Sequence, residues 1–467
     1  GLYHCFAHGP CLCNEVIACY GRVIGEVPEP EVTGLEALRA FARRLSHQLP
    51  KTTPMAHERF PLTYSGKKRT VYMNAVESLR KIPLRKSDAY CTAFVKLERL
   101  DPRAKASPDP RMIQYRSPRY GVSLGCYLRP MEHSIYELKS PRGHRIIGKG
   151  LNKEQRCALL VAKYNEFKDP VVLSIDASRF DKHVSLELLQ IEHSVYLSMN
   201  NDPVFKQMLD WQLINKCFTR NGLKYLVRGG RMSGDMNTAM GNCLLMYIMA
   251  ATYCQDVLPA YELLVDGDDT LIITEFEWRN RLNSMHAAFL DFGHEIKLEN
   301  ESRTIEGVNW CQSKPVHDGT SWRFTRDWRK VLSTLCCGNR HWKNPHVYKD
   351  MYYTVGQCLL AETYGLPILQ EFALKLLSSG GKFIKDFVDT DLHYKFSLEA
   401  GKSYFPRHVT PAARLSFERA WNVTVEEQLL VESSISKWKL TYGEPLIREA
   451  EITGSWRCES HIDDQLE

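Results

Sequence analysis

Residues 261–274 read Tyr-Glu-Leu-Leu-Val-Asp-Gly-Asp-Asp-Thr-Leu-Ile-Ile-Thr. Two short apolar runs, 263–265 and 271–273, flank a Gly-Asp-Asp tip, and Gly beside Asp between β-rich runs is a strong signal for a tight turn. We therefore predict a β-hairpin. Taken alone, such a tip is most often a plain solvated turn, because Gly and Asp suit turns for reasons of backbone conformation.

A second strand that ends in an acid is predicted upstream. Residues 171–176 read Val-Val-Leu-Ser-Ile-Asp, the pattern of a buried strand that ends at Asp176. Two such strands can lie side by side and bring Asp176 against Asp268. Neighbouring carboxylates repel each other, and a hard divalent cation with a preference for oxygen ligands relieves that repulsion. Together the two stretches indicate a cation site.

The composition is that of an ordinary globular protein. The chain has 467 residues, 44% of them hydrophobic and 25% charged, which is enough for two or three cores or one large multi-lobed enzyme. A net charge of +6 permits a polyanionic partner without requiring one. Fifteen cysteines scattered through core-like sequence fit a reducing compartment.

Two further features concern membranes and chain ends. No run of about 18 apolar residues predicts a membrane span. The first residue is Gly1 and not Met, from which we expect the chain to be cut, truncated or made as the downstream part of a longer product, with any targeting segment missing.

The first twenty residues are rich in potential zinc ligands. Their spacing matches no paired-ligand pattern, so we favour ordinary packing and leave a structural zinc ion as the alternative. These residues are His4, Cys5, His8, Cys11, Cys13 and Cys19.

Basic residues are frequent between positions 80 and 120. Aromatic residues interleave with them, and four prolines prevent one continuous helix. Such a segment can line a channel for phosphates, and the alternative is a solvated basic surface. The basic residues are Arg80, Lys81, Arg85, Lys86, Lys96, Arg99, Arg103, Lys105, Arg111, Arg116 and Arg119.

A glycine-rich loop from 228 to 234 precedes a predicted buried helix, in which Met236, Met240 and later apolar residues recur every four positions. The polar residues Ser233, Thr238 and Asn242 fall near the helix entrance. Small hydroxyls and an amide there suit a sugar or a phosphate.

The rest of the chain is mostly helical by pattern. We predict helices at 35–49, 184–196 and 278–292, a short strand at 308–314, and further helices from 328 onward. Thr410-Pro411 is a predicted helix start, with a cap residue followed by proline.

In their order and spacing, these stretches resemble the motifs of a viral RNA-dependent RNA polymerase of positive-strand RNA viruses, most like the tombusvirus, luteovirus and umbravirus group. The match covers roughly residues 96–314. It implies an α+β fold, a right-hand polymerase with fingers, a ferredoxin-like palm and a helical thumb. The implied parts are an N-terminal extension (1–34), fingers (35–167), palm (168–185), a fingers insert (186–227), palm (228–315), and a helical thumb with the C-terminal tail (316–467).

The resemblance also implies catalytic roles. Asp176, Asp268 and Asp269 would bind two Mg²⁺ ions about 3.5 to 4 Å apart, with Mn²⁺ as a substitute. Lys297 resembles a lysine that protonates pyrophosphate, and a surface lysine is the alternative. Asp181, with Ser233, Thr238 and Asn242, would read the 2′ hydroxyl that separates RNA from DNA substrates.

Nucleotide and RNA contacts are implied as well. Lys96, Glu98, Arg111 and Ile113 resemble the motif that roofs the nucleotide channel, in which Arg111 would hold the triphosphate and Ile113 would stack on the templating pair. Arg116, Arg119, Gly234 and Cys311 would contact RNA, although simple burial is the favoured interpretation of Cys311.

The implied reaction is template-directed addition of ribonucleotides to an RNA 3′ end. Expected partners are template and product RNA, ribonucleoside triphosphates, other viral replication proteins and host factors. The expected location is the host cytoplasm at membrane-bound replication complexes, which the chain would reach indirectly or through an upstream segment. A reverse transcriptase or DNA polymerase is one alternative, and a non-catalytic RNA-binding protein on a palm scaffold is another.

Overall fold

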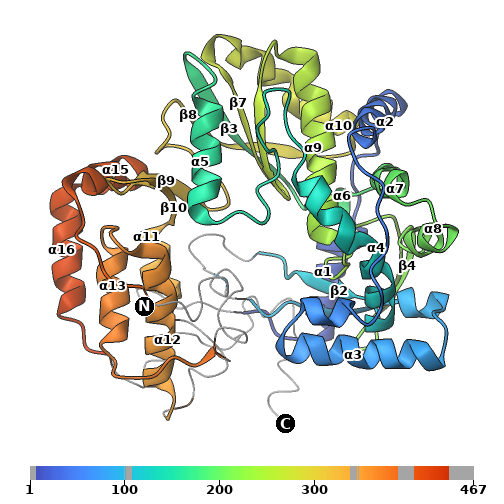
Figure 1. Ribbon diagram of the computed structural model, residues 1–467, viewed down its shortest axis with the longest axis horizontal. Coiled ribbons are helices and arrows are strands. Elements are labelled where there is room, and N and C mark those ends of the chain that lie inside the picture. Colours follow the sequence, from blue (N-terminus) through green and yellow to red (C-terminus); the bar gives the residue numbers. More distant parts are fainter. Residues whose placement is uncertain are drawn as a thin grey trace.

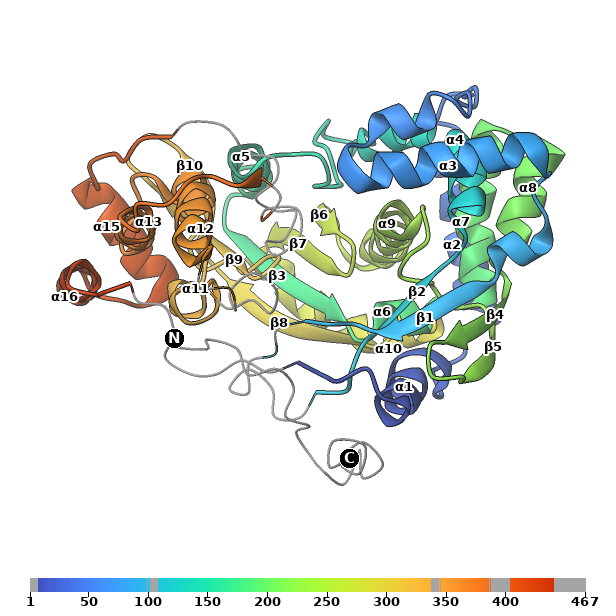
Figure 2. The same ribbon diagram turned by 90° about the horizontal axis from the view of Figure 1, so that it is seen from below.

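The computed structural model describes residues 7–98, 100, 108–336, 344, 346–385, 387 and 404–440. Helices and strands mix throughout this part of the chain, and its strands form three sheets. Figures 1 and 2 show α12, α13, α15 and α16 at one end of the molecule, α3, α4 and α8 at the other, and a central sheet between them. The mixed α and β character predicted from the sequence is confirmed.

The central sheet has the strand order β6-β7-β3-β8, and every neighbouring pair in it is antiparallel. It contains the predicted hairpin and the predicted acid-ended strand side by side. Along the chain, α9 connects β3 to the hairpin and α10 connects the hairpin to β8, with additional helices after β3. The strands are β3 (Pro170–Ala177), β6 (Glu262–Asp266), β7 (Asp269–Glu275) and β8 (Ile296–Ser302).

Both faces of this sheet are covered, which explains why β3 is apolar along nearly its whole length rather than alternating. Leu173, Ile175 and Val265 belong to the largest core, to which α9 also contributes. Val172 and Leu271 face the other way and pack with Leu160 and Trp310. The predicted buried helix after the glycine-rich loop is confirmed as α9 (Thr238–Val257), and α10 spans Met285–Asp291.

The second sheet has the order β2-β1-β4-β5, in which β1 runs parallel to β4. Its buried face packs with Ala18, Cys19 and Val23 from the N-terminal helices. These N-terminal helices lie against the sheet in Figure 2. The elements are α1 (Leu12–Cys19), the π-helix η1 (Tyr20–Ile24), β1 (Cys91–Val95), β2 (Met112–Tyr115), β4 (Ile214–Thr219) and β5 (Lys224–Arg228).

Further helices surround the two sheets. The helices predicted at 35–49 and 184–196 correspond to α2 and α7, while the segment predicted as one helix at 278–292 is a 3-10 helix followed by α10. The remaining elements here are α2 (Val32–Ser46), η2 (Phe60–Thr63), α3 (Gly66–Lys81), η3 (Lys86–Ala89), α4 (Pro118–Tyr136), α5 (Lys153–Tyr164), α6 (Phe180–His183), α7 (Leu186–Met199), α8 (Pro203–Asp210) and η4 (Phe276–Ser284).

The C-terminal helices share a separate core that includes Val355, Phe372 and Phe417. The predicted helix start at Thr410 is confirmed, because its hydroxyl accepts a hydrogen bond from the amide of Ala413. The strand predicted at 308–314 is wrong for most of its length. Cys311 and Gln312 adopt positive φ in a turn, and the strand starts only at Ser313. The elements are β9 (Ser313–His317), β10 (Trp322–Arg326), α11 (Trp328–Thr334), α12 (Tyr348–Thr363), α13 (Leu369–Leu377), α15 (Pro411–Trp421) and α16 (Val425–Ser436).

Across the described ranges, no helix combines the length and the apolar character needed to cross a membrane.

Two glycines of α4 provide a matched test of its packing. A Cβ at Gly125 would lie 2.4 Å from the ring of Phe60, which is fully buried, whereas a Cβ at Gly121 would meet its nearest neighbour at 3.6 Å. We predict that Gly125→Ala lowers the free energy of unfolding by about 1–3 kcal/mol through overpacking. Gly121→Ala should raise it by up to about 1 kcal/mol, because alanine favours the helix. Urea unfolding measures both, and equal effects of the two substitutions would contradict the packing described for α4.

Candidate active site

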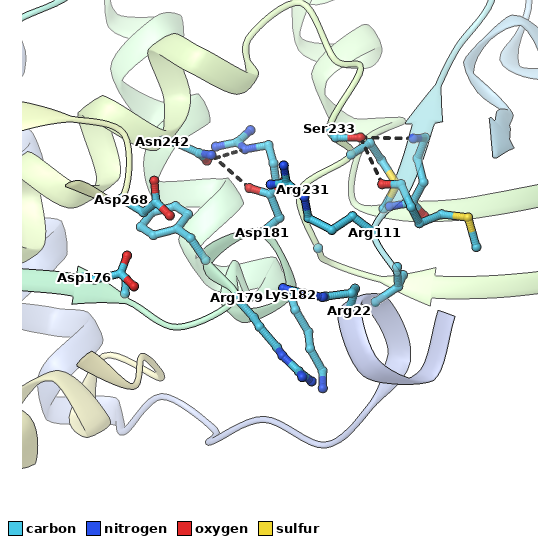
Figure 3. A pocket seen from close by; sticks show the side chains of 17 residues that line it. Arg22, Arg111, Asp176, Arg179, Asp181, Lys182, Arg231, Ser233, Asn242 and Asp268 are labelled. Atoms are coloured by element: carbon cyan, nitrogen blue, oxygen red, sulfur yellow. Dashed lines mark hydrogen bonds between the residues drawn. The ribbon is translucent and has the colours of Figure 1, made fainter. Parts of the chain in front are cut away.

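A cavity of about 360 Å³ opens where the central sheet meets α6, the loop before α9 and β2. Acidic side chains line one part of it and basic side chains another (Figure 3). The acids are Asp176, Asp181 and Asp268, and the bases are Arg22, Arg111, Arg179, Lys182 and Arg231.

The two acids on which the sequence prediction rested meet at this cavity. Asp176 comes from the end of β3 and Asp268 from the turn between β6 and β7, and Figure 3 shows their carboxyl groups facing the same space. Gly267 supports the turn with a φ of 60°, a conformation that a residue with a Cβ rarely adopts. The predicted convergence of Asp176 and Asp268 is confirmed.

Antiparallel pairing places four charged residues in one row across the strand ends. Asp269 lies opposite Asp266 on one side and opposite Asp176 on the other, and Asp176 lies opposite Lys297. Residues directly opposite one another project to the same face, and like charges in such positions destabilise a sheet. The row therefore concentrates three carboxylates and one exposed ammonium beside the cavity.

Two carboxylates of this row, and Asp268 in the adjoining turn, have pKa values above the ordinary value for aspartate. Burial, followed by the charges of Asp268 and Glu299, raises the pKa of Asp176 to about 6, and Lys297 opposes this shift only in part. Burial and then Asp268 and Asp176 raise the pKa of Asp269 to about 7. Burial likewise raises the pKa of Asp268. A nearby cation would favour the charged form of each of these groups, as is expected of carboxylates that bind a metal ion.

The outermost acid of the row behaves in the opposite way. Burial alone would raise the pKa of Asp266, but Lys149 and Arg156 together lower it below its ordinary value. Each of the two cations lies 2.8 Å from an Asp266 carboxylate oxygen. Arg156 belongs to α5 and also lies 4.1 Å from the ring centre of Trp310, whose indole N–H donates to the carbonyl of Asp269. This clamp fixes the base of the Gly-Asp-Asp turn.

Cys311 belongs to the same clamp. Its thiol lies 3.2 Å from a guanidinium nitrogen of Arg156 and 3.6 Å from a carboxylate oxygen of Asp266. The half-buried side chain is compatible with the packing that we favoured, and the RNA contact predicted for it stays a prediction.

The polar residues predicted to read a sugar are brought together in part. The amide of Asn242 donates to Asp181 over 2.9 Å, and Asp181, Asn242 and Ser233 all line the cavity. The hydroxyl of Ser233 accepts from the amide of Gln114 in β2 and so ties the loop to that strand. The hydroxyl of Thr238 donates to the carbonyl of Met232, which ties the first turn of α9 to the loop before it.

Of the predicted nucleotide motif, Arg111 contributes to the basic wall of the cavity, whereas Lys96, Glu98 and Ile113 are not among its lining residues. Arg111 binds Glu98 through two hydrogen bonds of 2.9 and 3.0 Å, and the carbonyl of Arg111 accepts from the amide of Lys96. Arg111 lines the cavity, and Ile113 lies two residues further along β2. Arg99, Arg103 and Lys105 lie outside the described residues.

Sequence reasoning missed four cations at the cavity, namely Arg22, Arg179, Lys182 and Arg231. Arg179 and Lys182 follow Asp176 closely in sequence, so a search of that motif for basic residues could have found them. Arg22 had no such signal, because η1 reaches the cavity from the segment predicted as an N-terminal extension. Burial, and then the charges of Arg179 and Arg111, lower the pKa of Arg22. Crowded cations of this kind favour an anionic ligand.

Two residues predicted to contact RNA have internal partners. Arg116 is buried and forms a two-point ion pair with Asp235, and both side chains are only 3% exposed. Arg119 binds Asp88, the hydroxyl of Ser78 and backbone carbonyls. These contacts give both arginines a role in packing, and the RNA contacts stay predictions.

Gly234, the third residue of that prediction, lies against β2. Its amide donates to the carbonyl of Gln114, and a Cβ at this position would lie 2.6 Å from that same oxygen. Glycine is therefore required for the close approach of the loop to the strand.

The structure was also searched for metal-binding groups. Within the part of the chain that it describes, no three His, Cys, Asp or Glu side chains are arranged to hold a metal ion. The thiols of Cys11 and Cys13 lie 2.8 Å apart, while His4 and Cys5 lie outside the described residues, so the zinc alternative stays open.

Comparison with known proteins bears on the whole chain. A sequence model of the family described as viral RNA-dependent RNA polymerase matches residues 19–443. The chain belongs to this viral RNA-dependent RNA polymerase family. The RNA-directed RNA polymerase of maize chlorotic mottle virus is 36% identical over 442 residues, which are 92% of this chain and 44% of that protein.

Other relatives of the polymerase family give the same result. The RNA-directed RNA polymerase of oat chlorotic stunt virus is 35% identical over 86% of this chain and 57% of that protein. The enzyme of turnip crinkle virus is 32% identical over 92% of this chain and 56% of that protein. The chain therefore spans about half the length of these curated relatives.

Repulsion within the row of carboxylates leads to a prediction about the stability of the protein in the absence of metal. Asp269 ionises near pH 4 in the unfolded chain but only near pH 7 in the folded protein. The free energy of unfolding therefore decreases as the pH rises from about 4 to about 7, and above pH 7 the ionised Asp269 destabilises the fold to its full extent. We predict that Asp269→Asn stabilises the protein at pH 8 in EDTA by on the order of 1 kcal/mol, a value reduced for partial solvation, and has no effect at pH 4. Thermal unfolding at both pH values measures this.

Glu36→Gln is the control, because Glu36 is an exposed acid within α2, outside the row and away from the C-terminal end of its helix. It should leave stability unchanged at either pH. A gain from Asp269→Asn that is equal at pH 4 and pH 8, or a loss at pH 8, would contradict the repulsion described above.

Proposed function

We propose that this chain is the catalytic core of an RNA-dependent RNA polymerase that replicates a positive-strand viral genome. The reaction is template-directed addition of a ribonucleoside monophosphate to an RNA 3′ end. The oxygen of the 3′ hydroxyl forms a bond to the α-phosphorus, that hydroxyl loses its proton, and the bond to pyrophosphate breaks. The observation that carries the proposal is the single cavity at which Asp176, Asp268, the Asp181–Asn242 pair and a basic wall meet.

The proposed architecture is a right hand. The order β6-β7-β3-β8, with α9 and α10 as the connecting helices, matches the β-α-β-β-α-β pattern of a ferredoxin-like palm. The sheet β2-β1-β4-β5 and its surrounding helices would be the fingers. The C-terminal helices with their own core would be the thumb.

The carboxylates fit a divalent metal ion. Asp176 and Asp268 offer hard oxygen ligands whose mutual repulsion a cation would relieve, and Asp269 adds a third oxygen donor beside them. Mg²⁺ typically uses one or two protein carboxylates together with substrate phosphates, so it needs no cage of three protein ligands. Two such ions, when bound, would lower the pKa of the 3′ hydroxyl and neutralise charge on the leaving pyrophosphate. Mn²⁺ would serve as a substitute.

The basic wall would orient the nucleotide. Arg111, fixed by Glu98 and joined by Lys96, would hold the triphosphate with its reacting phosphorus toward the acids. Ile113 would pack on the templating base pair. Lys297, exposed and directly opposite Asp176, would give a proton to pyrophosphate.

The Asp181–Asn242 pair favours RNA synthesis over DNA synthesis. DNA-making enzymes more often carry a bulky side chain that closes off the space for the 2′ hydroxyl, whereas this cavity presents a carboxylate and an amide that can hydrogen-bond to it. Ser233 supports the same wall. Thr238 would contribute through the loop that it stabilises.

Partners and location follow from the proposed activity. Template and product RNA and ribonucleoside triphosphates are the proposed ligands, and other viral replication proteins and host factors are proposed partners. We propose replication complexes on host membranes as the site of action, reached through a partner or through a further segment.

The assignment of Asp268 is directly testable. We predict that Asp268→Ala lowers ribonucleotide incorporation on an RNA template by more than about 100-fold, because charge stabilisation at the site is worth several kcal/mol. RNA binding should stay within about threefold of the wild type, since contacts between cations and phosphates dominate RNA affinity. Primer extension and a filter-binding assay measure the two effects.

Asp256→Ala serves as the control, because it removes an exposed acid from the far end of α9 and should leave both readouts unchanged. Substantial synthesis by Asp268→Ala would refute the assignment. Synthesis that is absent from the wild type in the presence of Mg²⁺ and Mn²⁺, while RNA still binds, would favour the non-catalytic alternative.

A further inference from the structure

A buried chain of hydrogen bonds runs from α7 to the cavity. Glu192 on α7 pairs with Arg231 in the loop before α9, and both side chains are fully buried. The Nε of Arg231 donates to the side-chain oxygen of Asn242 over 2.8 Å. The side-chain amide nitrogen of Asn242 in turn donates to Asp181 over 2.9 Å. Figure 3 shows the end of this chain at Arg231, Asn242 and Asp181.

The chemistry of arginine fixes the direction of the whole chain. A guanidinium has only donors, so Asn242 must turn its oxygen toward Arg231. The amide nitrogen of Asn242 is then forced to face Asp181, whose carboxylate accepts. With the amide reversed, its oxygen would face the carboxylate of Asp181, and its NH₂ group would face the guanidinium of Arg231. Both contacts would then be unfavourable.

Glu192 holds the guanidinium in place. It contacts both terminal nitrogens of Arg231, and its Oε2 accepts further hydrogen bonds of 2.8 Å from the hydroxyl of Tyr196 and the amide of Asn237. Breaking a buried pair of this kind leaves an uncompensated charge, so the pair is costly to disturb. Arg231 therefore has little freedom to turn away from Asn242.

Gly241 shows that this arrangement leaves no spare room. A Cβ at that position would lie 2.4 Å from Oε2 of Glu192 and 2.5 Å from a terminal nitrogen of Arg231. The α9 backbone and the ion pair are thus in direct contact, next to Asn242 in sequence.

We propose that the Glu192–Arg231 pair is a positioning device for sugar selection, which sets the amide of Asn242 and through it the carboxylate of Asp181 toward the ribose hydroxyls. The inference rests on the proposed function, since it deepens the role given there to Asp181 and Asn242. Neither Glu192 nor Arg231 needs to touch the nucleotide for this role.

The test replaces both charges together, because a lone Glu192 would be left buried without a partner. The double variant Glu192→Gln with Arg231→Met keeps the volume of the pair and removes the donor to Asn242. We expect the preference for ATP over 2′-deoxy-ATP, measured as the ratio of kcat/KM values in primer extension, to fall by about tenfold, the scale of one hydrogen bond to a charged group. Asn242→Ala should lower the same ratio to a similar extent.

Two further measurements keep the test decisive. If the double variant does not fold, Arg231→Lys keeps a cation opposite Glu192 but removes the Nε donor to Asn242, and it should lower the ratio by about threefold. Equilibrium binding of ATP and 2′-deoxy-ATP gives the same comparison without turnover. A wild type that prefers ATP in binding but makes no RNA would contradict the proposed polymerase activity and leave the positioning role standing.

Lys163→Met is the matched control. Lys163 of α5 and Glu262 of β6 form another fully buried ion pair, between that helix and the central sheet. Its loss should lower stability and leave the sugar preference unchanged. A folded Glu192 and Arg231 variant with the wild-type sugar preference would overturn the inference, and so would an equal change in the Lys163→Met control.

Discussion

Antiparallel pairing of β3 with β7 is the constraint on which the rest of the site depends. It places Asp176 directly opposite Asp269, and the turn that begins β7 carries Asp268 toward the same cavity. Three carboxylates are thereby held closer than they would remain in solution. The fold maintains this arrangement because both faces of the sheet are packed into cores, so the strands cannot slip without exposing apolar side chains.

The surroundings divide the acids into two kinds. Asp266 is neutralised by Lys149 and Arg156 and serves to hold the turn. Among the described residues, no such pair of cations contacts Asp176 or Asp269, and the pKa values of these two acids rise instead. Ion pairs thus stabilise the base of the hairpin, while the acids near its tip repel one another. This arrangement is consistent with a site in which a bound cation neutralises the acids. The basic side chains across the cavity complete a surface that suits a metal-bound, negatively charged nucleotide.

Several elements could be predicted from the sequence because their signals are local. The hairpin, β3, the buried helix α9 and the cap at Thr410 each follow from a pattern within about a dozen residues. The meeting of Asp176 and Asp268 followed from chemistry, since paired acids at two strand ends have few other uses. The sequence predicts a strand at the turn of Cys311 and Gln312, because apolar residues precede it. Both residues adopt positive φ, but neither is a glycine or an asparagine, the residue types that usually indicate that conformation.

What the sequence could not indicate depends on distant contacts. Arg22 enters the cavity from the N-terminal helices, and Arg116 finds its partner Asp235 in the loop before α9. The partner of Arg231 lies on α7, so no spacing rule connects them. Of the residues predicted to read the sugar, the structure brings Asp181, Ser233 and Asn242 to the cavity wall, whereas the hydroxyl of Thr238, at the start of α9, contacts the preceding loop.

The most direct test of the central claim is the anomalous scattering of Mn²⁺ in crystals of the protein soaked with Mn²⁺ and ATP. The account predicts a peak within coordinating distance of carboxylate oxygens from both Asp176 and Asp268, on the side of the cavity that faces the nucleotide. Crystals that contain the nucleotide but show no Mn²⁺ at these residues, or show their carboxyl groups turned toward separate regions, would contradict it.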